Sequence, residues 1–585
     1  MEFKKLSIKN FRNFESVNVN LTNQNVIFGM NDVGKTNFLY AIRFLLDREA
    51  RKNGFKESDF FQRNISEEIE IILEVSLEDY EDSDDTKFIV SKVGGARTTD
   101  NLNTFYFKLT SKFDTGEEIG EPKLYWGNDI EQLSLVPANG VFSDLDKIFK
   151  VVYLDPDINL ENIFKKNRRS IFNQSKLSDN DKGISKEIKQ MSNDLNEKIG
   201  EMTVIKEFQN VLTEEYHLLK KEAIKIELKS EMAINGYFDD LTPYIKKDND
   251  DNLYPTSGDG RKKIIAYSMM NHLIKNQGSN KIVVYLIEEP ENSLHRSMQI
   301  ALSYQLFNMD IYKYFFLSTH STELLYEMDK AALIRIYSGN KTDCASIIYK
   351  VDPSYEKFKK ELNRSLANAL FADKVLLVEG PSEKVLFERI LHLNNPFYEL
   401  EGGYLMEVNG IKFKPYVEVL SALNIKWFVK TDNDLKSKSN NKNHFDLIGL
   451  NRCIEIISGE KKEHIVIDLE SAKNDKGNYI KSAKEEIIKI EKIKLYEANR
   501  SLIKEFETKC IYLSKIDLEN DLYEAISGKM KELFGGNPIK KLQTAKLLNM
   551  IELAEKLEEK ECEKIYNHEL FTVLKEFSDY GLSGS

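Results

Sequence analysis

The sequence predicts an α/β protein with two separate sites, each built at the ends of buried strands. A glycine-rich loop at residues 29–36 follows a short apolar run, and acidic residues follow similar runs from residue 375 onward. The run at residues 282–287 is unbroken and apolar, as expected for a strand covered on both faces in a parallel sheet. With 585 residues, the chain is long enough for two to four domains.

The loop at residues 29–36 reads GMNDVGKT and matches G-x-x-x-x-G-K-[ST] in a strand–loop–helix context. In such a loop the glycines let backbone N–H groups surround the phosphates, and the lysine reaches the β- and γ-phosphates. The threonine hydroxyl can ligate Mg²⁺. The sequence therefore predicts an ATP site formed by Gly29, Asn31, Gly34, Lys35 and Thr36.

Two further strand ends complete this predicted site. The run at 282–287 ends in Glu288 and Glu289. A carboxylate there can hold Mg²⁺ through water, and the next can act as general base toward the attacking water. We assign Glu288 to the metal and Glu289 to the base. His320 follows the run at 314–317 and is a candidate sensor of the γ-phosphate.

Residues 256–261, TSGDGR, precede an apolar helix whose N-terminus could bind an anion. Together with the opening LSIKNFRNF at residues 6–14, these elements resemble the ABC-type ATPases of the RecF and SMC group. In that group, the serine–glycine signature of one subunit closes on the nucleotide of another. The resemblance implies at least a dimer in which Ser257 and Gly258 act in trans. Glu288 departs from the group, which usually has Asp there.

A second candidate site is acidic. Glu379 ends the apolar run at 375–378, and Pro381 suits the first position of a following helix that contains Glu383. The run at 425–429 leads to Asp432 and Asp434, which are two residues apart and can therefore share one cation. The run at 511–513 precedes a third acidic pair, Asp517 and Glu519. Hard oxygen ligands of this kind suit Mg²⁺ or Mn²⁺, although acidic pairs are most often solvated loops.

This second half resembles a Toprim domain, and an ABC-type ATPase followed by Toprim is the arrangement of the OLD family of nucleases. Within that family, the chain is similar to the nuclease subunits of Gabija antiphage systems. The resemblance implies five metal-site carboxylates: Glu379, Glu383, Asp432, Asp434 and Glu519. Asp517 is an extra carboxylate and a further candidate, because some relatives carry Ser at this position. It also makes Lys546 the candidate for stabilising charge at the scissile phosphate.

The resemblance implies an ATP-regulated, metal-dependent endonuclease that nicks or cleaves double-stranded DNA in antiphage defence. It further implies a homo-oligomer, a dimer or tetramer, and a separate helicase-like partner of the UvrD family. The alternative, from another class, is a DNA-repair ATPase that loads or remodels partners and carries a non-catalytic Toprim domain.

The expected organisation has four parts. Residues 1–165 and 246–350 form the ATPase, with strands of an outer sheet at 68–71 and 105–107. Residues 166–245 form a helical insertion with an apolar stripe that either packs on its own domain or pairs with another subunit. Residues 351–585 form the Toprim domain with C-terminal helices.

Composition is consistent with this organisation. The four cysteines lack C-x-x-C spacing, which argues against zinc and against a disulfide framework. We find no signal segment or membrane-spanning run and expect a cytoplasmic protein. The net charge of −12 argues against general DNA coating but leaves room for local basic clusters. Candidate clusters are residues 261–263, then Lys430, Lys436, Lys438 and Lys442, then Lys540 and Lys541.

Overall fold

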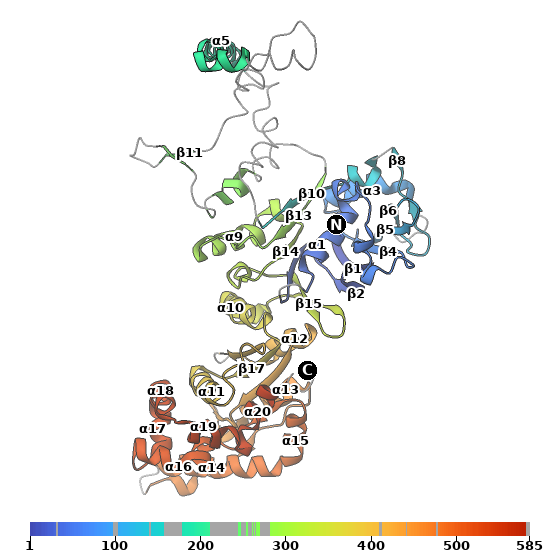
Figure 1. The fold of residues 1–585 in the computed structure, drawn as a ribbon. Helices are drawn as coiled ribbons and strands as arrows, with labels where there is room; N and C mark the ends of the chain where they lie inside the picture. The colour runs from blue at the N-terminus through green and yellow to red at the C-terminus, as the bar shows by residue number, and fades with distance from the viewer. Residues whose placement is uncertain are drawn as a thin grey trace. The chain divides into compact units, whose positions relative to one another are not determined.

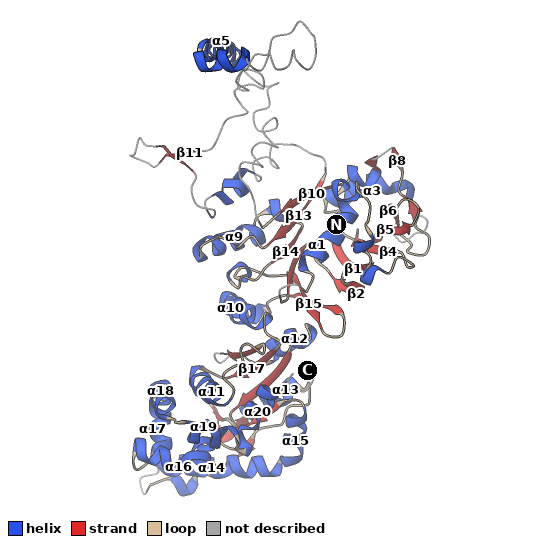
Figure 2. Ribbon diagram, in the orientation of Figure 1, coloured by secondary structure: helices blue, strands red, loops and turns tan. Residues whose placement is uncertain are grey.

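The computed structural model divides into two compact units. The first comprises Met1–Val152, Val283–Leu286 and Gln299–Ser585, and the second comprises Tyr153–Ile282 and Ile287–Met298. Figure 1 follows the chain from end to end, and Figure 2 marks its helices and strands. The described residues are 1–30, 33–96, 103–139, 142–156, 178–210, 244–246, 253–255, 260, 262–263, 265–269, 281–408, 412–439, 441–474 and 478–580.

The first unit opens with an antiparallel sheet in the order β2-β1-β4-β5-β6-β7. The predicted outer strands are confirmed as β4 and β5, which pair from Ile69 with Ser111 to Ser76 with Thr104. Asp84 and Asp85, which lie between these strands, form the first turn of helix α3, and the side chain of Ser83 caps its N-terminus. The bounds are β1 Glu2–Phe11, β2 Phe14–Asn20, β4 Ile69–Ser76, α3 Asp84–Val93, β5 Thr104–Asp114, β6 Ile119–Gly127 and β7 Ser134–Leu135.

A second sheet, in the order β10-β13-β14-β3-β15-β16, contains the strand that leads to the glycine-rich loop. Strand β3 pairs in parallel with both β14 and β15, and its residues Val26, Ile27 and Phe28 are fully buried. The sequence-predicted strands at 26–28, 282–287 and 314–317 are confirmed here, the last displaced by one residue. The bounds are β3 Gln24–Phe28, β10 Phe149–Leu154, β13 Ile282–Glu288, β14 Phe315–Ser318, β15 Ala331–Ser338 and β16 Thr342–Tyr349.

Helices follow the strands of this sheet. Helix α1 begins at Lys35, directly after the glycine-rich loop, and buries Phe38, Leu39 and Ile42. The expected strand–loop–helix order is therefore confirmed. The other helices in this part of the chain are α2 Arg48–Arg51, α9 Arg296–Asn308 and α10 Lys359–Leu370.

The second unit contains helix α5 (Asp179–Glu201), whose start is fixed by a capping box between Ser178 and Asp181. The helix lies within the expected insertion. Along its apolar stripe, Ile184, Met191 and Leu195 are exposed among the described residues. The unit also contains the short hairpin of β11 (Tyr244–Lys246) and β12 (Leu253–Pro255).

A four-stranded parallel sheet, β18-β17-β19-β23, forms the centre of the C-terminal half. All five residues of β17 are buried, as a strand covered on both faces requires. The strands predicted before each acidic group are confirmed as β17, β19 and β23. The bounds are β17 Lys374–Val378, β18 Gly403–Glu407, β19 Lys426–Thr431 and β23 Ile511–Leu513.

Helices pack against this sheet around one apolar core, which includes Leu376, Leu386, Phe428 and Leu522. Pro381 occupies the first turn of α11, as predicted. None of the described helices is long and apolar enough to cross a membrane. The bounds are α11 Pro381–Asn394, α12 Lys414–Ala422, α13 Ile448–Ile456, α14 Lys481–Ala498, α15 Arg500–Thr508, α16 Leu518–Phe534, α17 Pro538–Thr544, α18 Lys546–Lys556, α19 Glu559–Tyr566 and α20 Thr572–Asp579.

Candidate active site

The two glycines of the glycine-rich loop have positive φ angles, which favour glycine. Gly34 has φ 109°, and Gly29 has φ 154°. A Cβ atom on Gly29 would overlap the carbonyl oxygen of Ile336, so only glycine fits there. The ammonium of Lys35 is buried and donates to the carbonyl oxygens of Gly29 at 3.2 Å and Met30 at 2.9 Å. Thr36 is exposed in the first turn of α1, while Asn31 lies outside the described residues.

Arg12 and Asn13, in the N-terminal Asn-Phe-Arg-Asn segment, make hydrogen bonds that support this loop and the helix after it. The amide of Asn13 donates to the carbonyl of Val33 at 2.8 Å, and Asn37 donates to Asn13 at 2.8 Å. Arg12 donates to Asn37 at 3.0 Å and pairs with Asp59 at 2.9 Å. A polar network therefore connects the tip of β1 to the loop and to the first turn of α1.

His320 follows β14 at the same sheet edge as the loop, because Ser318 lies opposite Ile27 in the parallel register. Its ring is exposed and lies 6.3 Å from that of Phe371. Within the second unit, buried Glu288 accepts a hydrogen bond from Tyr153, and Glu289 accepts one from Asn292 at 3.2 Å. The predicted signature residues Ser257 and Gly258 lie outside the described residues.

The acidic site forms where β17, β19 and β23 end on one edge of the parallel sheet. Because neighbouring parallel strands end together, they bring residues far apart in sequence to one place. The centre of the group is Lys546, at the start of α18. Its Nζ atom lies 2.9 Å from Glu383 Oε1, 3.4 Å from Glu519 Oε1 and 3.8 Å from Asp432 Oδ2.

Glu379 belongs to a second part of the same group. Its Oε1 atom accepts hydrogen bonds from the backbone N–H of Asp432 at 2.8 Å and from the Thr431 hydroxyl at 2.5 Å. Arg452, on α13, also donates to this oxygen and donates to Thr431 at 2.6 Å. Sequence reasoning missed Arg452, because a single arginine far from the strand ends has no distinctive spacing. One oxygen of Glu379 is thus held by three donors.

The electrostatics of the group indicate a shortage of positive charge. Burial and the charge of Glu379 raise the pKa of Asp432, whereas Lys546 opposes the rise. Burial also raises the pKa of Glu519, again opposed by Lys546. Burial tends to lower the pKa of Lys546, but the carboxylates of Asp432, Glu383 and Glu519 raise it overall. One ammonium is therefore the shared counter-ion of three carboxylates.

One buried oxygen of this acidic group, Glu519 Oε1, accepts no hydrogen bond among the described residues. Among the described residues, no three acidic, histidine or cysteine side chains already have the spacing of a metal cage. Adjacent carboxylates repel one another, and the ammonium of Lys546, which lies among them, reduces that repulsion.

The two remaining predicted carboxylates flank the group. Asp434 pairs with Lys492 at 3.5 Å. Asp517 caps helix α16 by accepting from the N–H of Asn520 at 2.9 Å, and its other oxygen accepts from Gln543 at 3.0 Å. Both therefore have partners other than Lys546 in this structure.

The predicted basic clusters are only partly on the surface. Lys430 is buried, pairs with Asp521 at 3.0 Å and donates to the carbonyl of Leu570. Its assignment to a DNA-contacting cluster is wrong, because it points into the core beneath the sheet edge. Lys263 is also buried. Lys436, Lys540 and Lys541 are exposed and Lys438 is half-buried, while Arg261 and the side chain of Lys442 lie outside the described residues.

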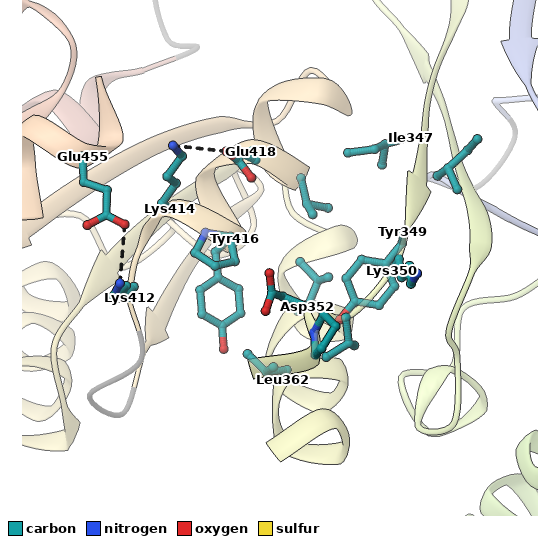
Figure 3. Close-up of a pocket in the computed structure, with 16 residues that line it drawn as sticks. Ile347, Tyr349, Lys350, Asp352, Leu362, Lys412, Lys414, Tyr416, Glu418 and Glu455 are labelled. Carbon is teal, nitrogen blue, oxygen red and sulfur yellow. Dashed lines mark ion pairs between the residues drawn. The ribbon is translucent and has the colours of Figure 1, made fainter. Parts of the chain in front are cut away.

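A separate hollow of about 620 Å³ lies between β16, α10 and α12, and Figure 3 shows its lining. Two ion pairs border it: Lys412 with Glu455 at 3.7 Å and Lys414 with Glu418 at 3.8 Å. Tyr416 lies between Lys412 and Asp352 (Figure 3). None of the residues predicted for the nucleotide or acidic site lines it.

Comparisons with known proteins match the N-terminal and C-terminal parts of the chain to two different family models. Residues 370–434 match the family described as "Overcoming lysogenization defect protein-like, TOPRIM domain", which covers Glu379 to Asp434. Residues 1–356 match a family described as "Protein of unknown function (DUF2813)".

Two curated relatives are similar over long stretches. "Endonuclease GajA" of Bacillus cereus (strain VD045) is 51% identical over 585 residues, covering 99% of this chain and 100% of that protein. "DNA replication and repair protein RecF" of Streptococcus uberis (strain ATCC BAA-854 / 0140J) is 24% identical over 58% of this chain and 99% of that protein. A solved SMC head bound to the C-winged helix domain of ScpA matches with a TM-score of 0.35 and 14% identity over 60% of this chain and 98% of that one.

Proposed function

The chain belongs to the family of GajA endonucleases, and we propose that it is an ATP-regulated, metal-dependent enzyme that nicks or cleaves double-stranded DNA in antiphage defence. The observation that supports this most strongly is the meeting of Glu383, Asp432 and Glu519 around Lys546. Asp432 follows β19, whereas Glu383 and Glu519 lie in the first turns of α11 and α16, so three separate segments each supply one carboxylate. Burying several negative charges together costs free energy, and such groups are typical of functional sites.

The side chains present fit a hard divalent cation such as Mg²⁺ or Mn²⁺. All candidate ligands are carboxylate oxygens, the type these ions prefer. The buried Glu519 Oε1 atom, which accepts no hydrogen bond among the described residues, supplies one such ligand. Glu379, Glu383, Asp432 and Glu519 would hold the metal, with Asp434 and Asp517 adding charge from the flanks. When bound, the metal activates water and stabilises the leaving oxygen of the phosphodiester.

The protein's own groups would prepare that reaction. The three donors on Glu379 Oε1 fix its carboxylate, and its second oxygen would be the one to bind the cation. Lys546 is the positive charge of the group. With a divalent cation held by the carboxylates, its ammonium would be available to stabilise negative charge on a non-bridging oxygen of the scissile phosphate.

ATP would act through the separate loop around Lys35. The hydrogen bonds of Asn13 to Val33 and of Arg12 to Asn37 would support this loop and the first turn of α1 when nucleotide binds. Glu288, Glu289 and His320 would complete the nucleotide site, with Ser257 and Gly258 supplied by another subunit. The proposal includes a homo-oligomer, a dimer or tetramer, for that trans contact. It also includes a helicase-like partner protein of the UvrD family, which only the resemblance to Gabija nucleases supports.

Supercoiled plasmid provides the direct test. Purified protein should convert it to nicked or linear DNA with Mg²⁺ and fail to do so in EDTA, and ATP should change the rate. Intact plasmid under all of these conditions would favour the second interpretation, an ATPase that loads or remodels other proteins and uses its Toprim domain without cutting.

A further inference from the structure

A small antiparallel sheet begins one residue after Asp434. It consists of β20 (Leu435–Lys438), β21 (Asn441–Leu447) and β22 (Ile465–Val466). One face is apolar: Phe445 is buried against Ile467 and Leu469, and Leu435 and Ile465 pack against this cluster. The register fixes which residues occupy the opposite face, since side chains alternate along a strand.

The opposite face is polar and mainly basic. Lys436 lies opposite Asp446, and His444 lies opposite Val466. Lys438 lies two residues after Lys436 on β20, and residues i and i+2 of a strand face the same side. Its ammonium lies 3.5 Å from Asp446 and 3.1 Å from Nδ1 of His464.

The contact between Lys438 and His464 determines the form of that histidine. An ammonium can only donate, so Nδ1 of His464 must accept and its ring proton lies on Nε2. The rings of His444 and His464 stack, with centroids 4.7 Å apart and an interplanar angle of 27°. The stack holds the His464 ring in place and leaves its Nε2–H as a donor even when the ring is neutral.

Lys436, Lys438 and His464 therefore offer two positive charges and a fixed N–H donor, beside the carboxylate of Asp446. This combination suits closely spaced anionic oxygens along a polymer, as in a phosphodiester backbone. Lys436 is two residues from Asp434, which corresponds to about 7 Å along an extended strand. A duplex whose scissile bond is at the acidic site would pass within reach of this face.

We propose that the outer face of β20–β22 binds the sugar–phosphate backbone of the DNA substrate and places the duplex beside the acidic site. This inference rests on the proposed nuclease function and specifies the surface that receives the substrate. Base edges are not involved, so the contact would be independent of DNA sequence.

The test is the salt dependence of DNA binding. Fluorescence anisotropy with a labelled duplex, in Ca²⁺ to limit cutting, would be measured over a range of NaCl concentrations. The double variant Lys436→Gln/Lys438→Gln should bind about eight-fold more weakly per lost phosphate contact near 0.1 M salt. The negative slope of log K against log salt should become shallower by about 0.9 for each lost contact.

Two further variants separate this contact from general charge effects. Lys504→Gln/Lys509→Gln removes the same charge from exposed positions on and just after α15 and should bind like the wild type. Asp446→Asn removes the carboxylate that pairs with Lys438 and leaves that ammonium available to DNA, so the variant should bind DNA several-fold more tightly. A purely structural role for these residues would not produce a gain.

Each outcome decides the inference. It is supported if Lys436→Gln/Lys438→Gln lowers DNA affinity and makes the salt dependence shallower, if the α15 variant does neither, and if Asp446→Asn raises DNA affinity. It is overturned if both lysine pairs behave alike or if neither changes the slope. In that case, wild-type nicking of plasmid would leave the nuclease proposal standing, whereas a wild type that neither binds nor nicks DNA would overturn both.

Discussion

Lys546 Nζ donates a hydrogen bond to Glu383 Oε1 at 2.9 Å, across 163 residues of sequence. This bond connects the first turn of α11, beside β17, to the start of α18. It places a positive charge among carboxylates that burial and mutual repulsion would otherwise tend to protonate. The acidic site is thus organised around an internal cation before any metal is considered.

Lys546→Gln should move the acid limb of the nicking rate to higher pH. The pKa of Asp432 is already raised, first by burial and then by Glu379, and Lys546 is the group that lowers it. Without Lys546 the pKa rises further, so a higher pH is needed to obtain the carboxylate that holds the metal. Rates measured against pH should show this shift, whereas Lys556→Gln at the exposed end of α18 should not.

The same variant should lose stability near neutral pH without metal, by roughly 1–3 kcal/mol, because it removes the counter-ion of partly buried carboxylates. A carboxyl whose folded-state pKa is raised favours folding while it is protonated, and that contribution is lost as pH rises through the folded pKa. The deficit should therefore shrink on acidification. Urea unfolding at several pH values would check it, and an unchanged deficit would contradict the role given to Lys546.

Metal choice should follow the ligand type. Mg²⁺ or Mn²⁺ should support nicking, and Ca²⁺ should support DNA binding better than cutting, because its looser coordination positions water poorly. The plasmid assay with each ion, after dialysis against EDTA, measures this. Undiminished cutting in excess EDTA would exclude the acidic group as the active site.

Lys35→Ala should weaken ATP binding by about ten-fold or more, because a charge-assisted contact to phosphate is lost. The variant should still nick DNA without nucleotide, since Lys35 takes no part in phosphodiester chemistry. It should lose the change in rate that ATP causes in the wild type. Four reactions, each protein with and without ATP, are enough, and a wild-type response by the variant would exclude this loop as the ATP sensor.

Asn13→Ala should weaken ATP binding about five-fold while leaving metal-dependent nicking without ATP unchanged. The substitution removes one hydrogen bond to the loop, at Val33, and one from Asn37. Titration of a fluorescent ATP analogue would measure the loss. Asn18→Ala, on neighbouring β2, is a matched control, and equal effects of the two variants would mean that the brace has no specific role.

Much of the fold could be predicted from the sequence because its buried parallel strands are continuous apolar runs. The strands at 26–28, 282–287 and 511–513 are visible in this way, and the helix starting at Pro381 follows from the fixed geometry of proline. The bracing role of Asn13 could not be predicted, because it depends on a turn that brings β1 beside the loop.

The candidate site was visible in its residue types but not in its pairings. Spacing placed carboxylates at strand ends, yet it could not show that Lys546 rather than another lysine lies among them, since α18 begins far from β17. Nor could spacing reveal that Lys430 is buried against Asp521, because a lysine beside an acidic loop resembles a surface residue. Arg452 reaches Glu379 only through the packing of α13.

The most direct test of the central claim compares the wild type with Glu379→Ala on supercoiled plasmid in Mg²⁺. Loss of a metal ligand should reduce nicking by more than about a hundred-fold. The circular dichroism spectrum and ATP binding should stay as in the wild type, because Glu379 lies outside the nucleotide loop. Wild-type nicking by a folded Glu379→Ala protein would contradict the assignment of the acidic group as the nuclease centre.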